Sequence, residues 1–339
     1  MLQVKTLADL EREMAARNLG GHWQMDARQL PATPRTQVQP YLWRWADVWA
    51  ALEQAGELVS LEFAGRRTIR LFNPGLAPPS STTHTLHLSV QLVKPGEVAE
   101  CHRHTLAALR FVVRGRGAYT TVEGQQCRMA PGDLVLTPNW TWHDHTNDTD
   151  EPIVWLDGLD IPLVQALQQV AFEPFAEATQ PIAVASDALP SPYGQAEGGA
   201  AGSYPHPCFH YRWSDAAAAL DALVRAGEPD PYDAYHLPYV NPATGGPTMP
   251  TIGCALTLLP PGHETRAHRH TSTVIYHAFR GSGTTCVGDE RFDWGPGDTF
   301  VVPLWYPHHH VNAGGAAAVL FSMSDEPVLR ALGLYRQEG

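Results

Sequence analysis

The sequence predicts an all-β protein in which one antiparallel barrel occurs twice. From Arg67 onwards, short runs of alternating or β-branched residues are separated by turn signals such as NPG, KPGE, RGRG and APGD. Short strands at this spacing are typical of a sandwich or a barrel. The 29 glycines and 29 prolines favour turns over long helices. A histidine pattern that occurs in both halves of the chain predicts the duplication.

The two copies of the histidine pattern are separated by 165 or 166 residues. The landmarks of the first copy are Gly96, His102, His104, Gly115, Gly132, Pro138, His143 and Asn147. Those of the second copy are Gly262, His268, His270, Gly281, Gly297, Pro303, His308 and Asn312. Because so many landmarks return at one offset, the pattern indicates an internal duplication and not a coincidence.

A few segments outside the strands have a helical pattern. Residues 4–19 predict an amphipathic helix, and the aromatic run at 41–52 predicts either a second helix or a packing segment. Residues 161–170 and 214–226 also predict helices, and EPVLRALGLY predicts a short closing helix near the C-terminus.

These observations divide the chain into four segments. Residues 1–65 form an N-terminal helical and aromatic arm, and residues 66–160 form the N-terminal barrel. Residues 161–240 hold connecting helices and a linker, which the Ser, Pro, Gly and Ala content places at 186–202. Residues 241–339 form the C-terminal barrel.

Composition excludes several classes of partner. The net charge of −12 argues against nucleic acid or an anionic membrane as the main partner, since phosphate binding needs clustered Lys and Arg. No apolar run approaches the length of a transmembrane helix, and the charged N-terminus does not have the pattern of a signal peptide. Five scattered cysteines without a C-x-x-C motif fit reduced thiols, so we expect a cytoplasmic protein.

Three histidines in each half predict a metal site. Alternate residues of a strand share a face, so His102 and His104 lie on the same side. His143 follows 39 residues after His104, about the length of a return through two hairpins. Three inward imidazoles can form one face of a metal site and leave the opposite positions open to substrate. The alternative is a set of hydrogen-bonded core histidines. The second half could bind another metal through His268, His270 and His308.

Both halves resemble the cupin superfamily. They match its motifs G-x5-H-x-H and G-x5-P-x-G-x2-H-x3-N, with two departures. The usual Glu ligand position falls on Ala108 and Val274, and the second motif's Gly position falls on Trp140 and Trp305. Three neutral histidines without a carboxylate leave a divalent metal at charge +2, so the site favours an anionic chelating substrate.

The first half resembles the gentisate 1,2-dioxygenase family more specifically. The strings HRHTLAALRFVVRGRGAYT and PGDLVLTPNWTWHDHTND carry this resemblance. The family includes salicylate, 5-substituted-salicylate and 1-hydroxy-2-naphthoate dioxygenases. Membership implies a bicupin, which consists of two double-stranded β-helix (jelly-roll) barrels with short flanking helices. It also implies Fe(II) in a catalytic N-terminal barrel, dioxygen as co-substrate and a homotetramer. The iron ligands would be His102, His104 and His143.

The resemblance also implies residues that bind the substrate. Arg66 and Arg110 match positions that bind its carboxylate, although the adjoining Arg67 is an alternative to Arg66. A guanidinium pairs with a carboxylate in a bidentate manner. Gln91 matches an amide that could reach a ring substituent, with a hydrogen-bonded core amide as the equal alternative.

Four further residues are candidates for the same pocket. His145 could face the cavity as an acid or base, or be a spectator, and Asp157 matches an orienting position or a simple turn. His87 and Ser89 stand where the family commonly has Trp and Gly, on the same strand face as Gln91.

The expected reaction opens the ring between the carboxyl-bearing and hydroxyl-bearing carbons. Gentisate is the default substrate, and salicylate, 5-nitro- or 5-halosalicylate and 1-hydroxy-2-naphthoate are alternatives. In the second half Tyr276 stands where Arg110 stood, so we expect that barrel to be structural or regulatory, with its metal content open. A non-catalytic or isomerase-type bicupin is the alternative from a different class, although an isomerase would usually keep the missing Glu.

Overall fold

The computed structural model describes residues 5–25, 31–78, 81–186 and 209–339. Contacts divide the chain into two units, Met1–Arg35 and Thr36–Gly339. The first unit contains helix α1 (Leu7–Ala15), which agrees with the predicted amphipathic helix, and a short 3-10 turn η1 (His22–Gln24). Thr6 caps α1, because its hydroxyl accepts a hydrogen bond from Asp9 N at 3.1 Å. The predicted linker at 186–202 lies almost wholly outside the described residues.

The N-terminal barrel is built from two facing sheets with the strand orders β12-β8-β5-β10-β3-β2 and β11-β4-β9-β6-β7. Its strands are β2 (Thr68–Arg70), β3 (His87–Val93), β4 (Val98–His104), β5 (Ala108–Arg114), β6 (Tyr119–Val122), β7 (Gln125–Arg128), β8 (Leu134–Thr137), β9 (His143–Thr146), β10 (Ile153–Leu159), β11 (Phe172–Pro174) and β12 (His210–Tyr211).

The C-terminal barrel repeats this plan. Its large sheet has the order β1-β19-β16-β21-β14-β13, opposite the smaller sheets β18-β17-β20 and β15-β22. The strands are β1 (Tyr41–Trp43), β13 (Tyr235–Pro238), β14 (Gly253–Leu259), β15 (Arg269–His270), β16 (Val274–Arg280), β17 (Gly283–Val287), β18 (Glu290–Trp294), β19 (Thr299–Val302), β20 (His308–Val311), β21 (Ala318–Ser324) and β22 (Gln337–Glu338).

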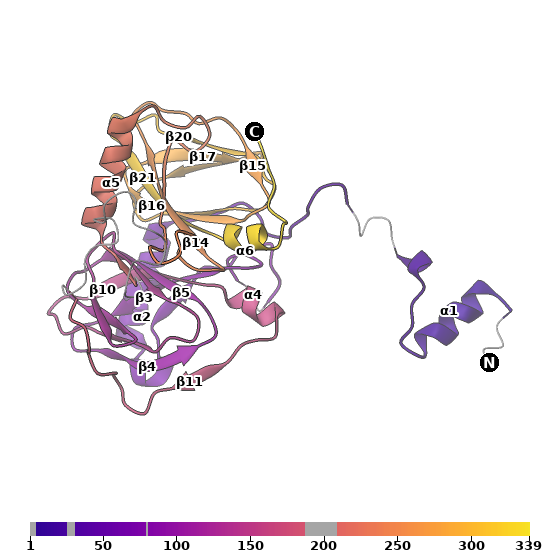
Figure 1. Cartoon of the computed structure of the whole chain (residues 1–339), viewed down its shortest axis with the longest axis horizontal. Helices are drawn as coiled ribbons and strands as arrows, with labels where there is room; N and C mark the ends of the chain where they lie inside the picture. Colours follow the sequence, from indigo (N-terminus) through magenta and orange to yellow (C-terminus); the bar gives the residue numbers. More distant parts are fainter. Residues whose placement is uncertain (1–4, 26–30, 79–80, 187–208) are drawn as a thin grey trace. The chain divides into compact units, whose positions relative to one another are not determined.

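Short helices flank the two barrels, which confirms the predicted fold class (Figure 1). They are α2 (Trp45–Leu58), α3 (Leu61–Ala64), α4 (Ile161–Ala166), α5 (Trp213–Ala226) and α6 (Glu326–Ala331). The aromatic run at 41–52 combines both predicted alternatives, since it begins as strand β1 and continues as helix α2. No helix among the described residues is long and apolar enough to cross a membrane.

The two repeats exchange their first strands. Strand β1 precedes the N-terminal barrel in sequence, yet it pairs with β19 of the C-terminal barrel. Strand β12 likewise precedes the C-terminal barrel and pairs with β8 of the N-terminal one. An aspartate of the receiving barrel then binds the start of the following helix. Asp298 accepts from Trp45 N and Asp133 accepts from Trp213 N, both at 2.8 Å. The duplication therefore extends into the segments before each barrel.

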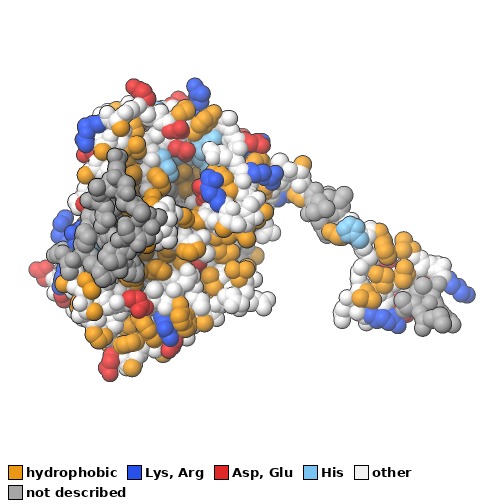
Figure 2. Space-filling model, viewed as in Figure 1, with side chains coloured by type: hydrophobic (Ala, Val, Ile, Leu, Met, Phe, Trp, Pro, Cys, Tyr) orange, Lys and Arg blue, Asp and Glu red, His pale blue; other side chains and the backbone are white. Residues whose placement is uncertain are grey.

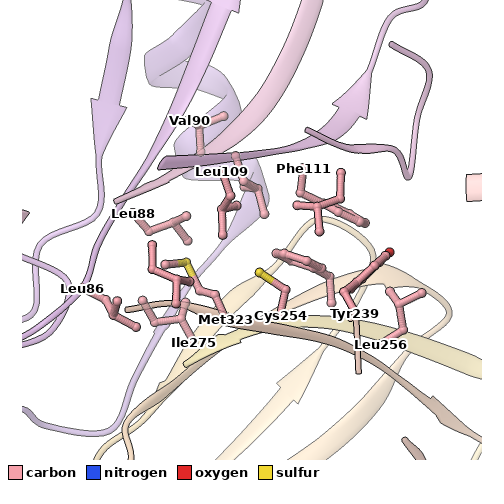
Figure 3. Packing of buried hydrophobic residues seen from close by; sticks show 14 of the residues in the cluster. Leu86, Leu88, Val90, Leu109, Phe111, Tyr239, Cys254, Leu256, Ile275 and Met323 are labelled. Carbon is pink, nitrogen blue, oxygen red and sulfur yellow. The ribbon is translucent and has the colours of Figure 1, made fainter. Parts of the chain in front are cut away.

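The largest hydrophobic core lies between the barrels (Figure 3). Leu88 and Val90 of β3 point into it, and Phe111 of β5 stacks on Phe321 of β21 with ring centroids 4.1 Å apart. Because side chains alternate along a strand, the other face of β3 lines the interior of the N-terminal barrel. One face of each large sheet thus joins the barrels while the opposite face forms a cavity.

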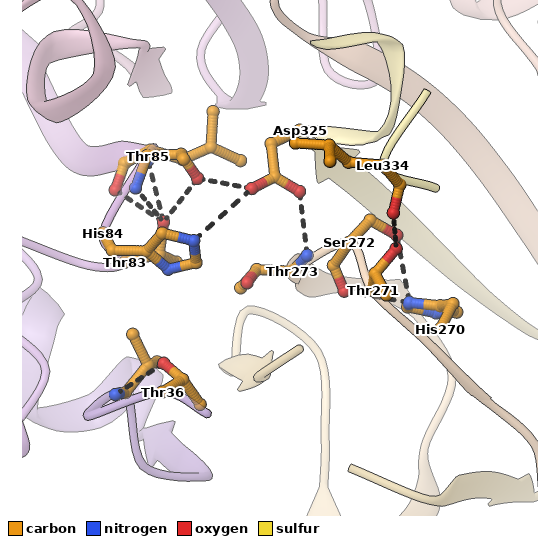
Figure 4. A network of polar contacts seen from close by, with 12 residues as sticks. Thr36, Thr83, His84, Thr85, His270, Thr271, Ser272, Thr273, Asp325 and Leu334 are labelled. Atoms are coloured by element: carbon orange, nitrogen blue, oxygen red, sulfur yellow. Dashed lines mark hydrogen bonds and ion pairs between the residues drawn. The ribbon is translucent and has the colours of Figure 1, made fainter. Parts of the chain in front are cut away.

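Two buried aspartates connect the barrels in a reciprocal manner. Asp325, after β21, accepts from the backbone N of Thr273 at 2.8 Å and from the hydroxyl of Thr85 in the other repeat at 2.6 Å (Figure 4). Asp160, after β10, accepts from Ala107 N at 2.9 Å and from the Thr251 hydroxyl at 2.7 Å. Each carboxylate thus holds the segment just after its own H-R-H motif and a threonine of the other repeat. We call this arrangement the aspartate clamp.

The aspartate clamp should contribute to stability. Thr85→Val keeps the side-chain shape but removes the hydroxyl that Asp325 binds, so a buried carboxylate loses a donor. We expect the free energy of unfolding to fall by about 1–3 kcal/mol. Thr251→Val should have a similar effect through Asp160. Chemical denaturation would measure both, with the exposed Thr179→Val as control. Equal stability of Thr85→Val and the control would contradict the assignment.

His277 is a buried titratable group at the inter-barrel core. Its side chain lies edge-on to Phe111, and Nδ1 is 3.0 Å from the Thr299 hydroxyl. Burial lowers the pKa of His277 to about 4. The unfolded chain therefore takes up a proton near pH 6.5, whereas the folded chain does not do so until near pH 4. Stability from this site is complete above pH 6.5 and falls as the pH drops from 6.5 to 4.

His277→Phe should weaken the acid sensitivity of the fold. The substitution copies Phe111, which occupies the matching position in the first repeat, and removes the titrating group. At pH 5 we expect the free energy of unfolding of the wild type to be about 2 kcal/mol lower than at neutral pH because of His277. The variant lacks this loss. The difference in Tm between pH 7 and pH 5 would measure this. His236→Gln at an exposed site is the control, and an unchanged pH dependence in His277→Phe would refute the prediction.

Candidate metal centre and substrate pocket

Three histidines of the N-terminal barrel converge on one point. His102 and His104 come from β4 and His143 from β9, and register pairs His102 with His143. Their candidate ligand atoms all lie within 4.8 Å of one another, and all three residues are buried. Each Nδ1 lies 2.9–3.0 Å from a backbone carbonyl oxygen, which fixes the ring in the manner of histidines that bind a metal through Nε2. We call this set the N-terminal triad.

Electrostatics keep the N-terminal triad neutral. Burial lowers the pKa of His104 to about 4, and burial together with the Arg66 cation lowers that of His102 to about 3. The pKa of His143 is also well below its usual value, chiefly through burial. Its Nε2 is buried with no hydrogen-bond partner among the described residues. Neutral imidazoles with a free lone pair are the form that binds metal, so the donor set fits a divalent ion.

The motif asparagine and glycine explain why these strands meet. Asn147 follows β9, and its Nδ2 donates to the carbonyl of Val93 at the end of β3. Gly96 forms the intervening turn with φ +77°, a left-handed conformation that suits glycine, and its N donates to the Asn147 carbonyl. In the second repeat Asn312 donates to Leu259 in the same way. These contacts hold β4 and β9 in register.

The structure separates the two adjacent arginines. Arg67 is buried and donates to both carboxylate oxygens of Glu97, at 2.8 and 2.9 Å. Arg66 points the other way, and its guanidinium lies 2.8 Å from the Nδ1 and 3.2 Å from the Nε2 of His102. Burial lowers the pKa of Arg66 to about 10, with a further contribution from the neighbouring Arg110. Arg66 is therefore the cation available at the triad.

Arg110 and Asp157 lie in one row across the large sheet. Register pairs Asp157 of β10 with Arg110 on one side and with Ser89 on the other. Arg110 donates to the Thr137 hydroxyl at 2.9 Å, and its Nε is 3.7 Å from Asp157 Oδ1. Burial lowers the pKa of Arg110 and raises that of Asp157. Arg110 Nε and Asp157 Oδ1 lack a hydrogen-bond partner among the described residues, which suits groups that await a ligand.

Gln91, His87 and Ser89 share the inner face of β3. Both polar atoms of the Gln91 amide are buried without a partner in the described part of the chain. His87 Nδ1 lies 3.2 Å from the Ser81 hydroxyl, and burial, with the Arg70 cation, lowers the pKa of His87 to about 4. The interior of the barrel is thus polar and uncharged at this position.

His145 lies two residues beyond His143 on the same face of β9. Its Nδ1 is 2.8 Å from the Thr120 hydroxyl, and its ring centroid is 5.2 Å from that of Trp155. Burial lowers the pKa of His145 well below its usual value, and no described residue binds its Nε2. The free nitrogen makes His145 able to exchange a proton or a hydrogen bond with a ligand.

Arg103 is a supporting residue that the sequence interpretation missed. It donates through Nε and Nη2 to Glu173 of β11, at 2.8 and 2.7 Å. Its guanidinium also stacks over Trp140 and Trp142 at 4.6 and 4.4 Å. Trp140 has φ +62° where the cupin motif has Gly, and its N donates to the carbonyl of His104. The sequence contained a signal for this contact, because the Arg of H-R-H and the Trp in place of the motif Gly occur in both repeats. In the second repeat Arg269 likewise stacks over Trp305.

A cavity of about 640 Å³ opens beside His102. Arg66, Glu62, Glu100 and Phe172 belong to its lining. Phe172 of β11 stacks on His102 with ring centroids 5.0 Å apart. The cavity is large enough for a small aromatic ligand and reaches the triad at His102, whereas His104, His143 and Arg110 do not belong to its lining.

The C-terminal barrel holds an equivalent set of buried histidines, His268, His270 and His308, within 4.8 Å of one another. We call these the C-terminal triad. The sequence interpretation missed His310, which matches His145 and lies 2.8 Å from the Thr285 hydroxyl. Ser322 stands where the first barrel has Asp157, and Tyr276 where it has Arg110. The two barrels therefore share donors for a metal but not the charged groups around it.

Comparison with known proteins agrees with this geometry. A cupin domain model matches residues 89–159 and 255–324. The chain is 42% identical to the 5-aminosalicylate 1,2-dioxygenase of Comamonas sp, over 97% of this chain and 89% of that protein. It is 37% identical to gentisate 1,2-dioxygenase 1 of Aquipseudomonas alcaligenes, over 96% and 94%. The crystal structure of salicylate 1,2-dioxygenase from Pseudoaminobacter salicylatoxidans with gentisate superimposes with a TM-score of 0.89 at 30% identity, covering 99% and 94%.

His104→Ala should remove the metal of the N-terminal barrel. The substitution deletes one of three donors, and we expect the metal content to fall by one equivalent per chain while the circular dichroism spectrum stays unchanged. His87→Ala is the matched control, since His87 is buried in the same barrel outside the triad. Elemental analysis after dialysis measures both. A His104→Ala protein with the wild-type metal content would disprove the ligand assignment.

Proposed function

Because this chain belongs to the gentisate 1,2-dioxygenase family of bicupin ring-cleaving enzymes, we propose that its N-terminal barrel opens a salicylate-type aromatic acid with Fe(II) and dioxygen. The ring would break between the carboxyl-bearing and hydroxyl-bearing carbons. The observation that carries this proposal is a neutral triad of buried histidines, with the half-buried Arg66 beside His102 and the buried Arg110 on the facing sheet. His102, His104 and His143 would hold the iron. Family membership sets aside the non-catalytic and isomerase-type alternatives.

Fe(II), when bound, supplies the redox and Lewis-acid chemistry that activates the aromatic ring and dioxygen. The protein supplies charge and position. Three neutral imidazoles leave the ion at +2, and Arg66 and Arg110 add two more positive charges. Asp157 is the nearby acidic group on the row of Arg110. The pocket thus favours an anion that carries more than one oxygen donor.

The two arginines would orient the substrate carboxylate. Arg110 is held from the far side by the Thr137 hydroxyl and lies beside Asp157, so its guanidinium has little freedom. Arg66 reaches the triad from the mouth of the cavity. A carboxylate between them would meet donors in the planar geometry that guanidinium groups offer. Asp157 would act by positioning Arg110.

His145 is our candidate for proton transfer. Its Nε2 is free among the described residues, and its Nδ1 is hydrogen-bonded to the Thr120 hydroxyl, which fixes the ring. A neutral imidazole at neutral pH can accept a proton or share a hydrogen bond at Nε2. Its position two residues from His143 on the same strand face supports this role.

The polar wall formed by Gln91, His87 and Ser89 bears on the choice of substrate. Gentisate carries a second ring hydroxyl, and we retain it as the default. 5-Aminosalicylate is a second candidate, because a 5-aminosalicylate dioxygenase is 42% identical over nearly the whole chain. The 5-nitrosalicylic acid dioxygenase of Bradyrhizobium sp matches only 32% of this chain, which gives less support to nitro or halo substituents. Salicylate and 1-hydroxy-2-naphthoate remain alternatives.

Two further properties are proposed on the basis of the family. We expect a homotetramer and a cytoplasmic location, with a small hydroxy acid as the ligand and neither nucleic acid nor membrane as a partner. On the face shown in Figure 2, acidic and basic side chains are scattered over both barrels and do not gather into a basic patch. This distribution gives no support to binding of nucleic acid.

Oxygen consumption tests the proposed reaction. The protein, reconstituted with Fe(II) without air, should consume dioxygen when gentisate or 5-aminosalicylate is added, and a new near-ultraviolet product should form. Comparison of kcat/KM across gentisate, salicylate, 5-amino-, 5-nitro- and 5-halosalicylate and 1-hydroxy-2-naphthoate would rank the substrates. If iron is retained but every one of these compounds is inert, the proposal fails.

Arg66→Gln and Arg67→Gln should have different effects, although the residues are adjacent. Arg66→Gln removes a proposed carboxylate ligand, so we expect kcat/KM to fall by about 10–100-fold with the Tm nearly unchanged. Arg67→Gln breaks the buried pair with Glu97, so the main effect should be a lower Tm. Steady-state kinetics and thermal melts on both variants give the comparison. The reverse pattern would assign the substrate role to Arg67.

A further inference from the structure

The surroundings of the C-terminal triad differ in charge from those of the N-terminal triad. In the first barrel, the group that approaches the first histidine is a cation, Arg66, next to His102. In the second barrel, it is a carboxylate. Asp233 Oδ1 lies 3.6 Å from the Nε2 of His268. Both groups lie just before the edge strand of the large sheet, β2 in one barrel and β13 in the other.

The distance between Asp233 and His268 fits two donors of one metal ion. At 3.6 Å the pair is too far apart for a good hydrogen bond. Two donors at about 2.0–2.1 Å from a tetrahedral Zn²⁺ would be separated by about 3.3 Å. The separation therefore agrees with a shared ion at this pair of donors. Among the described residues only the three histidines have ligand atoms all within 4.8 Å of one another, so the Asp233 side chain has to turn toward His270 and His308 to complete the site.

The other two histidines are prepared in the manner of metal ligands. His270 Nδ1 lies 2.9 Å from the Ser272 carbonyl, and His308 Nδ1 lies 3.2 Å from the Tyr306 carbonyl. His308 is 1% exposed, and its Nε2 has no partner among the described residues. A buried polar atom without a hydrogen bond destabilises the fold unless a ligand binds it.

A constrained turn holds Asp233 at the mouth of the barrel. The Asp230 carboxylate accepts from the backbone N of Tyr232 and of Asp233, at 2.8 and 3.0 Å. Ala234 follows with φ +53°, a left-handed conformation that is costly for a residue with a Cβ. The Pro231 carbonyl accepts from Arg266 N at 2.7 Å, which ties the turn to the segment that leads into His268.

The cavity beside the C-terminal triad lacks the features of the proposed substrate pocket. Its volume is about 370 Å³, and Tyr276 lines it where the first barrel has Arg110. Arg330 also lines it but donates to Glu326 at 2.6 Å and stacks on Tyr335. Strand β22 pairs with β15 beside the triad and closes this side of the barrel. Three imidazoles and one carboxylate leave a divalent ion at charge +1, so its demand for an anionic ligand is smaller.

We propose that the C-terminal barrel binds one tetrahedral Zn²⁺ ion through His268, His270, His308 and Asp233, and that this ion is structural. Four protein donors of N and O type complete a tetrahedral zinc site, as expected of structural zinc. The ion joins strands β15 and β20 to the turn before β13. The two barrels thus use the same histidine motif for two purposes, and the partner of the first histidine decides which.

Zinc binding by the His104→Ala protein tests this proposal, since that variant disables the N-terminal triad. After chelation, reloading with Zn²⁺ and dialysis, we expect one equivalent per chain. A further His308→Ala substitution should abolish it. Asp233→Asn in the same background should raise the Kd for Zn²⁺ by about tenfold or more. Glu264→Gln is the matched control, because this exposed acid lies 3.7 Å from His309, outside the triad.

Cobalt substitution gives a second readout. Co²⁺ in the His104→Ala protein should show the intense visible bands of a tetrahedral site, and Asp233→Asn should weaken or shift them. Retention of no Zn²⁺ by the His104→Ala protein would overturn the proposed site. Equal binding by Asp233→Asn and Glu264→Gln would overturn the role of Asp233, and a weak octahedral-type cobalt spectrum would overturn the coordination.

Discussion

The alternation of side chains along β3, β5 and β10 is the constraint on which the rest of the structure depends. One face of this sheet is buried against the second barrel, so its strands cannot slip in register without exposing Phe111 and Leu88. The opposite face therefore presents Gln91, Arg110 and Asp157 at fixed positions. Buried polar atoms without partners destabilise the folded protein, and the packing of the inter-barrel core keeps their side chains in place.

Charge then distinguishes two centres of common origin. The histidine geometry is the same in both barrels, because it depends on strand pairing and on the asparagine that follows each second-motif histidine. The difference lies in the side chains that approach the histidines from the edge and from the middle of the large sheet. Arg66 and Arg110 bring two cations to the first centre, with Asp157 beside Arg110, whereas the carboxylate of Asp233 approaches the second centre and Tyr276 stands in place of the arginine.

Much of the fold could be predicted from the sequence, because the relevant rules are local. The H-x-H spacing places His102 and His104 on one face, and the constant offset identifies the second barrel. His310 was also within reach, since it matches His145 at the same offset. The choice between Arg66 and Arg67 could not be predicted, because it depends on which of the two arginines pairs with Glu97. Asp233 was equally hidden, since only the folded chain brings it to a histidine 35 residues away. Strand exchange is non-local and leaves no periodic signal.

The exchange of β1 and β12 bears on how such a chain could arise. The large sheet of each repeat has an edge strand, β8 or β19, that pairs with the first strand of the other repeat. A single repeat would therefore be self-complementary, and two identical copies could satisfy each other about a twofold axis. Fusion of the genes for such a swapped pair would yield the present architecture without a new interface. Halves joined in this way could diverge in chemistry while each still received a strand from the other.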